Sequence, residues 1–133
     1  MNKRHLDAFL DAIHRLDIVA AAAYIDDAIV VRNPLFPEPI MGKAAVIPVL
    51  THVLAIADRY EVVDTLRSET HFAVVHRFIF GDVEIEGVDY IHLNDAGLID
   101  ALTVMWRPLP AVVAVQALVA PVLGAPVLKL VQA

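Results

Sequence analysis

Apolar and polar positions alternate along three stretches in the second half of the chain, residues 71–80, 83–93 and 98–107. All three are rich in β-branched and aromatic residues, which favour strands. The dipeptide Gly81-Asp82 suits a two-residue hairpin loop, and residues 94–97 are dense in turn-forming side chains. The pattern therefore predicts two consecutive hairpins of one antiparallel sheet.

The two turns also set the register of the strands. Phe80 is expected opposite Val83 across the first turn, and Leu93 opposite Leu98 across the second. Side chains alternate along a strand, so the register decides which residues share a face. The pairings that follow are His76 with Gly87, Val74 with Asp89, Asp89 with Leu102, Gly87 with Val104 and Ile85 with Trp106.

One face of this predicted sheet is apolar except for His76 and Asp89. An ionised carboxylate among apolar side chains costs free energy unless a partner or water compensates, and perturbed groups gather in functional sites. We therefore expect the two residues to form the polar centre of a pocket. Asp89 would be protonated and donating, or ionised and orienting His76 as a general base. The structural alternatives are a carboxylate satisfied by a helix end or by water, and a histidine satisfied within the core.

Five further residues are candidates for contact with a ligand. Asn33 can position a water or a carbonyl, although Asn before Pro is also a common turn opener. Trp106, Phe78 and Val104 share the apolar face, where they line a pocket or simply fill the core. Tyr24 offers a hydroxyl to the pocket or anchors the end of a helix.

The first half of the chain predicts helices and a proline loop. Apolar residues at helical spacing indicate a helix over 3–15, and Asp17 is the expected N-cap of a second helix that ends near Ile25. A short strand at 29–31 leads into a loop with three prolines. The remaining elements are a helix over 43–57 and an entering strand over 60–66. The helix is apolar on nearly every side and is therefore expected to be buried, and Pro48 inside it is a place where it can kink.

Beyond Arg107 the chain is apolar, with Lys129 as its one charged residue. Its clean helix, residues 111–120, is about 15 Å long, half of the roughly 30 Å that crosses a bilayer. We expect residues 1–107 to form the domain and residues 108–133 an extension, whose first part packs as a helix on the open end of the domain or on a partner subunit, because its apolar side chains are costly in water. The rival interpretation, an interfacial membrane anchor, lacks the usual Lys/Arg-rich polar face.

Composition and motifs argue against several classes of partner and cofactor. A net charge of −6 without a Lys/Arg cluster argues against nucleic-acid binding. The histidines do not converge with a carboxylate at ligand spacing, so no metal is expected, and no glycine-rich phosphate motif indicates a nucleotide cofactor. The N-terminus lacks an unbroken apolar segment of the secretory kind, which makes the cytoplasm the expected compartment.

The hydrophobic fraction, 59%, exceeds the usual range and calls for a ligand cavity, a subunit interface or a membrane. The outer face of the predicted sheet is too apolar for water alone. We expect a homodimer through this face, with charged residues as a polar rim. The apolar set is Ala73, Val75, Ile79, Val88, Ile99, Ala101 and Met105, and the rim is Arg77, Glu84, Glu86 and Arg107.

The order of elements resembles the SnoaL-like, ketosteroid-isomerase-like (nuclear-transport-factor-two-like) superfamily. The local matches are residues 24–28 at the end of the second helix, Asn33-Pro34 with Gly42 after the loop, residues 87–90 and residues 94–97, and together they span residues 3–107. The resemblance implies an α+β cone. In this fold a curved antiparallel sheet wraps the N-terminal and central helices and leaves an apolar pocket, often in a dimer.

The resemblance also assigns expectations to single residues. Ketosteroid isomerases place a catalytic Asp where this chain has Asn33, and a protonated Asp that donates to an oxyanion where it has Asp89. Their oxyanion tyrosine falls near Phe9 or Ile13, which have no hydroxyl.

The limonene-epoxide-hydrolase branch is similar in its loop asparagine, at Asn33. That branch has a tyrosine at the position of Val31 and an acid at the position of Val104, so neither polar set is complete. The resemblance implies a small hydrophobic ligand and cofactor-free acid–base chemistry, as isomerase, cyclase, dehydratase or hydrolase. The alternative is a non-catalytic ligand-binding or dimerisation module of the same fold.

Overall fold

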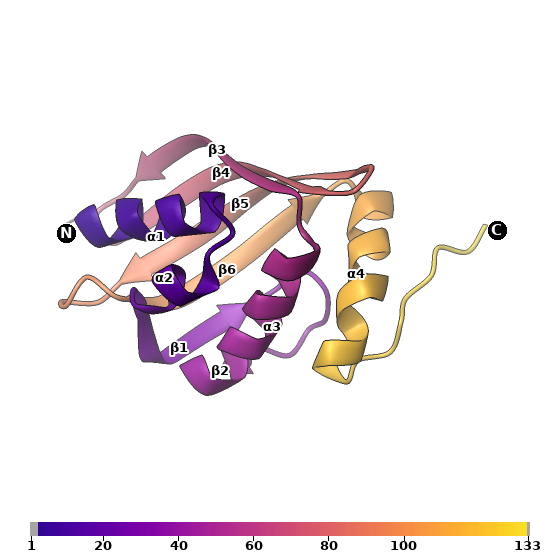
Figure 1. Cartoon of the computed structure of the whole chain (residues 1–133), viewed down its shortest axis with the longest axis horizontal. Coiled ribbons are helices and arrows are strands. Elements are labelled where there is room, and N and C mark those ends of the chain that lie inside the picture. Colours follow the sequence, from indigo (N-terminus) through magenta and orange to yellow (C-terminus); the bar gives the residue numbers. More distant parts are fainter. Residues whose placement is uncertain (1–2, 133) are drawn as a thin grey trace.

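The structure is a computed structural model that describes residues 3–132. It combines one curved six-stranded sheet with helices on one face and at one end (Figure 1). The strands are β1 (Ile25–Arg32), β2 (Ile40–Met41), β3 (Arg59–Arg67), β4 (His71–Phe80), β5 (Val83–Leu93) and β6 (Ile99–Arg107). The helices are α1 (Arg4–His14), α2 (Ile18–Ala22), α3 (Lys43–Ile56) and α4 (Leu109–Leu123). The predicted α+β fold is confirmed.

The sheet has the order β2-β1-β6-β5-β4-β3. Every neighbouring pair is antiparallel except β1 and β6, which run parallel. The expectation of a purely antiparallel sheet is therefore wrong at this one pair. The first strand is also longer than predicted, because it starts directly after α2 at Ile25 and runs beside the last strand.

The pairing of β4 with β5 follows the predicted register, from Phe80 opposite Val83 to Val74 opposite Asp89. The predicted pairing of β5 with β6 is wrong by two residues, because Asp89 lies opposite Val104 and Gly87 opposite Trp106. One residue of this offset arises at the turn and the other at an irregularity between His92 and Leu93. An even offset keeps each side chain on its face, so the predicted inner residues of β6 remain inner.

Ile99 lies before the second of these two offsets and is therefore turned to the other side of the sheet. It is 1% exposed and lines the internal cavity. Its predicted place on the outer, dimer-forming face is wrong, since a single-residue offset reverses the side-chain direction.

Capping and periodicity shape the helices. The carboxylate of Asp17 accepts a hydrogen bond from the backbone N–H of Ala20 at 3.1 Å and so caps α2, as predicted.

The prediction that α3 is buried on nearly every side is wrong. Its buried residues are Val46, Val53 and Leu54. Its apolar character comes partly from small residues on an exposed side, namely Ala44, Ala45, Pro48 and Ala55.

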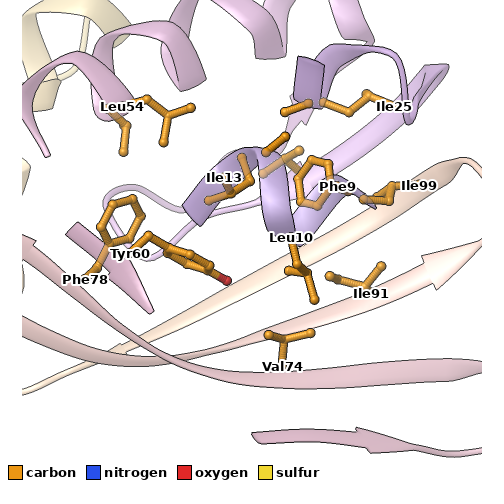
Figure 2. Packing of buried hydrophobic residues seen from close by; sticks show 14 of the residues in the cluster. Phe9, Leu10, Ile13, Ile25, Leu54, Tyr60, Val74, Phe78, Ile91 and Ile99 are labelled. Atoms are coloured by element: carbon orange, nitrogen blue, oxygen red, sulfur yellow. The ribbon is translucent and has the colours of Figure 1, made fainter. Parts of the chain in front are cut away.

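The core lies between α1, α3 and the inner face of the sheet. Figure 2 shows side chains from helix and sheet meeting there, among them Phe9 and Ile13 of α1, and Tyr60 and Phe78 of neighbouring strands. Tyr60 and Phe78 pair across β3 and β4, and their rings meet edge to face with centroids 5.0 Å apart. Burying such aromatic side chains supplies much of the hydrophobic stabilisation.

Helix α4 stands across one end of the sheet (Figure 1), where it packs on α3, β5 and β6. Val115 and Val119 are fully buried, whereas Leu118 and Val122 are exposed. The proposed apolar packing of the segment therefore involves one side of the helix only. No helix within residues 3–132 has both the length and the apolar character that crossing a membrane requires.

The segment after α4 is held by Gln116, whose side chain is 2% exposed. The amide group donates to the carbonyl of Pro126 and accepts from the backbone N–H of Leu128, both at 2.8 Å. Gln116 is thus a buried side chain that holds the following segment against α4. The side-chain amide of Gln116 supplies hydrogen-bond partners to two backbone groups of an extended segment that is not paired with a strand of the sheet.

Candidate functional site

The inner face of the sheet, α1, α3 and the proline loop enclose a cavity with a volume of about 120 Å³. Leu123 of α4 completes the wall at one end. Six of the seven residues that the sequence proposes for the site line this cavity, and they come from β4, β5, β6 and the loop after β1: Asn33, His76, Phe78, Asp89, Val104 and Trp106. The remaining residue, Tyr24, does not line it. Its ring lies 5.5 Å from that of His5.

Asp89 is the acceptor at the polar centre of the cavity. Its Oδ2 accepts a hydrogen bond from the hydroxyl of Tyr60 at 2.8 Å and lies 3.3 Å from Nδ1 of His76. The side chain keeps 14% of its surface exposed, whereas that of His76 keeps 1%. The predicted proximity of His76 and Asp89 is therefore observed, and both side chains occupy the inner face.

Tyr60 is a site residue that the sequence does not identify. Burial first, and then the charge of Asp89 and the hydrogen bond to it, raise the pKa of the Tyr60 hydroxyl well above its usual value. The hydroxyl consequently stays protonated and donates to Asp89. Figure 2 shows Tyr60 among the core side chains between α1 and the sheet.

Nothing local in the sequence predicts this role for Tyr60, because the sequence does not show which residues of β3 face the inside of the fold. The strand pairs with β4 through an irregularity between Val62 and Asp64, which changes the face that its residues present. Tyr60 precedes that irregularity and lies opposite Phe78, an inner residue of β4. An aromatic residue at the start of the entering strand is the one available signal.

His76 is fixed by its surroundings. Nδ1 faces two acceptors, Asp89 Oδ2 at 3.3 Å and the carbonyl of Val74 at 3.4 Å. The ring lies beside that of Tyr60, with centroids 4.9 Å apart. Because both neighbours of Nδ1 are acceptors, this nitrogen carries the proton in the neutral ring, and Nε2 keeps its lone pair. Nε2 is buried and has no hydrogen-bond partner.

Gly87 makes room for the rings above it. A Cβ atom at this position would lie 2.5 Å from Cδ1 of Trp106 and 2.6 Å from Nε2 of His76. Such distances are far inside van der Waals contact, so only glycine allows the two rings to approach each other over β5. The absent side chain lets the imidazole of His76 and the indole of Trp106 both lie over Gly87.

The other polar groups on the cavity wall are donors. Asn33 uses its Oδ1 to accept from the backbone N–H groups of Leu35 and Phe36, at 2.8 and 3.2 Å, as a turn opener does. Its Nδ2 and the Nε1 of Trp106 are both buried without a partner. Buried polar groups are normally paired. Within residues 3–132, the unpaired buried side-chain atoms are these two, His76 Nε2 and Nδ1 of His5, so three of the four belong to cavity residues.

The rest of the cavity wall is apolar, and it contains no lysine or arginine. Among the residues that the structure describes, no group of three His, Cys, Asp or Glu side chains is arranged to hold a metal ion. The arrangement therefore offers one oriented base, one acceptor that orients it, and two free donors in an apolar enclosure. These groups suit proton transfer on a mostly hydrophobic molecule.

Several solved structures have an architecture similar to that of this chain. A steroid delta-isomerase from Pseudomonas aeruginosa is similar with a TM-score of 0.81 and 24% identity, covering 91% of this chain and 90% of that one. An uncharacterised protein with a cystatin-like fold from Silicibacter pomeroyi gives 0.81 and 21%, covering 88% and 83%. A putative SnoaL-like polyketide cyclase from Shewanella denitrificans gives 0.64 and 9%, covering 79% and 89%.

No family model matches the sequence, and no curated protein matches it. At these identities the structural likeness establishes the fold alone. The chain has the SnoaL-like, ketosteroid-isomerase-like fold, as the order of its elements indicates.

Proposed function

On this ketosteroid-isomerase-like fold, we propose a cofactor-free acid–base enzyme in which Nε2 of His76 removes a proton from a small, mostly apolar molecule in the cavity. The observation that carries the proposal is the chain of contacts from Tyr60 through Asp89 to His76, which ends in a buried nitrogen without a partner. A group held in this way is oriented for proton transfer before the substrate arrives.

Asp89 acts as an ionised acceptor rather than as an acid in this proposal. The Tyr60 hydroxyl and Nδ1–H of His76 both face its Oδ2. A carboxylate that accepts from both holds the imidazole in one tautomer and stabilises the imidazolium that forms when Nε2 takes a proton. Of the two roles that the sequence allows for Asp89, this geometry favours the second.

The simplest reaction of such a site is isomerisation. Nε2 takes a proton from the carbon that lies between a carbonyl and a carbon–carbon double bond, and the electrons of the C–H bond form a dienolate. The imidazolium then returns the proton to the far carbon of the dienolate, so the double bond moves into conjugation with the carbonyl, the base is regenerated and every atom is conserved. The cavity wall carries one base and no further titratable acid beyond Asp89, so a reaction in which one group both takes and returns the proton fits it better than one needing a separate acid.

The test is proton exchange in deuterium oxide. A panel of small ketones is incubated with the protein, and loss of the α-proton signal is followed by NMR. His76→Gln and Asp89→Asn should each slow exchange by at least about 10²-fold, the usual contribution of a general base. His71→Gln is the matched control, because His71 belongs to the same strand and its side chain lies on the opposite face of the sheet. Equal rates in all four proteins would refute the acid–base function.

A non-catalytic ligand-binding module is the second candidate. The observation in its favour is Asn33, an amide at the position where ketosteroid isomerases have their catalytic carboxylate. Its signature in the same experiment is saturable ligand binding without α-proton exchange in the wild-type protein.

We further propose a homodimer through the outer face of the sheet. Met105 and Tyr90 on this face are 52% and 43% exposed. The ion pair between Arg77 of β4 and Glu84 of β5 supplies charged side chains of the kind a polar rim has. Sedimentation at micromolar concentration should give a dimer mass, and Met105→Glu should shift the protein toward monomer. A monomer mass for the wild-type chain would contradict the proposal.

A further inference from the structure

Two buried hydrogen-bond donors on the cavity wall are not used by the base or by the fold. Nε1–H of Trp106 and the Nδ2 amide of Asn33 have no acceptor. Neither atom can accept a hydrogen bond itself. A buried donor without an acceptor is destabilising, so a ligand that supplies an acceptor is bound preferentially over one that does not.

The electrostatics of the wall select a neutral acceptor. The titratable lining residues are His76 and Asp89, and no lysine or arginine is present. A carboxylate or phosphate in the ligand would meet Asp89 without a compensating cation, which is costly in an apolar enclosure. A carbonyl oxygen has two lone pairs for two donors and carries no charge, so it fits this wall.

The volume limits the size of the ligand. The cavity measures about 120 Å³, and a cavity of about 150 Å³ is known to hold benzene. One six-membered ring therefore fills the enclosed part. Phe9 of α1, Trp106 of β6 and Leu123 of α4 are among the residues that line it. A fused polycyclic body exceeds this volume.

We propose that the cavity takes a neutral carbonyl compound of single-ring size, with its oxygen bound by Nε1–H of Trp106 and the Nδ2 amide of Asn33. The inference concerns the same site as the proposed function and names its substrate class. It rests on the two donors and on the volume, and it requires binding rather than turnover.

Trp106 is the one tryptophan of the chain, so its indole N–H gives a single, assignable NMR resonance inside the cavity. The protein is titrated with cyclohexanone, with methylcyclohexane, with cyclohexanecarboxylate and with a four-ring steroid ketone. Cyclohexanone should shift the indole resonance saturably in the direction of a stronger hydrogen bond. The other three compounds should bind at least about tenfold more weakly, because they lack an acceptor, carry a charge or exceed the volume.

Asn33→Asp isolates one donor. It keeps the Oδ1 that accepts from Leu35 and Phe36, so the loop remains capped, but it replaces the donating amide by an acceptor. Cyclohexanone affinity should fall by about tenfold or more, and the drop for Trp106→Phe, followed through the ligand's own resonances, should be similar. Asn33→Ser provides the second variant, since its hydroxyl can both cap the loop and donate.

The inference is overturned if methylcyclohexane binds as tightly as cyclohexanone, if Asn33→Asp binds cyclohexanone as the wild type does, or if the steroid ketone binds more tightly than the single ring. Failure of the proposed function looks different. Selective cyclohexanone binding without any α-proton exchange would refute catalysis and leave the ligand class standing.

Discussion

Replacing Gly87 by alanine tests whether the histidine base and the indole of Trp106 depend on the missing side chain. The added Cβ would lie 2.5 Å from Cδ1 of Trp106 and 2.6 Å from Nε2 of His76. His76 is 1% exposed and is held through Asp89, so it has little room to move. The indole, which borders the cavity, must therefore shift.

Two effects of opposite sign set the magnitude. Overpacking of this kind costs about 1 to 3 kcal/mol, whereas alanine is better than glycine inside a strand by about 0.5 to 1 kcal/mol. The net loss of unfolding free energy should be about 0.5 to 2 kcal/mol. Since 1 kcal/mol corresponds to roughly 4 °C at this chain length, Tm should fall by several degrees.

Urea unfolding followed by circular dichroism measures this loss, and the indole resonance of Trp106 reports the local shift. The control is the double variant Gly87→Ala with Trp106→Leu, in which the smaller side chain leaves room for the Cβ. The alanine should cost less in that background, giving a coupling energy of about 1 kcal/mol. A Gly87→Ala protein as stable as the wild type, with an unmoved indole resonance, would refute the reasoning.

Three further predictions concern the second layer of the site and the C-terminal segment. Tyr60→Phe should lower stability at neutral pH by about 1.5 kcal/mol through loss of a hydrogen bond to a carboxylate. Because the pKa of Tyr60 is raised in the folded chain, the stability that its hydroxyl contributes is fully present below the ordinary tyrosine pKa and is lost as the pH rises above that value. The urea midpoint of the wild type should therefore fall more steeply above about pH 10 than that of Tyr60→Phe. Parallel curves would contradict the raised pKa of Tyr60. Gln116→Ala should release the segment that Gln116 binds at Pro126, so trypsin should cut after Lys129 faster than in the wild type. An unchanged cleavage rate would show that the Gln116 hydrogen bonds do not hold the segment in place. Truncation after Arg107 removes the buried Val115 and Val119 and should give an aggregating or strongly destabilised protein; a stable, soluble fragment would show that the extension is dispensable.

The pairing of β4 with β5 was predictable because a two-residue loop leaves one way for the strands to meet. Every predicted pair from Phe80 with Val83 onward is observed, and this alone brings His76 and Asp89 to the same face. The proline loop likewise fixed the place of Asn33, since three prolines exclude a helix or central strand.

The register of β6 was not predictable, because irregularities in a ladder leave no clear mark in the sequence. One of them turned Ile99 inward, and another in β3 concealed the inward direction of Tyr60. Gln116 shows a different limit. A single polar residue in an apolar helix marks a water-facing side or a buried hydrogen-bond partner equally well, and the choice depends on where residues 126 and 128 lie.

The central claim is that the neutral imidazole of His76 carries its proton on Nδ1 and presents an unprotonated Nε2 to the cavity. Long-range ¹H–¹⁵N correlation NMR of the histidine ring measures this tautomer directly, without a substrate, at a pH where the ring is neutral. The account predicts a protonated Nδ1 and a bare Nε2 in the wild type, and a mixed or inverted tautomer in Asp89→Leu, where the carboxylate acceptor is gone. A wild-type His76 that carries its proton on Nε2 would contradict the account.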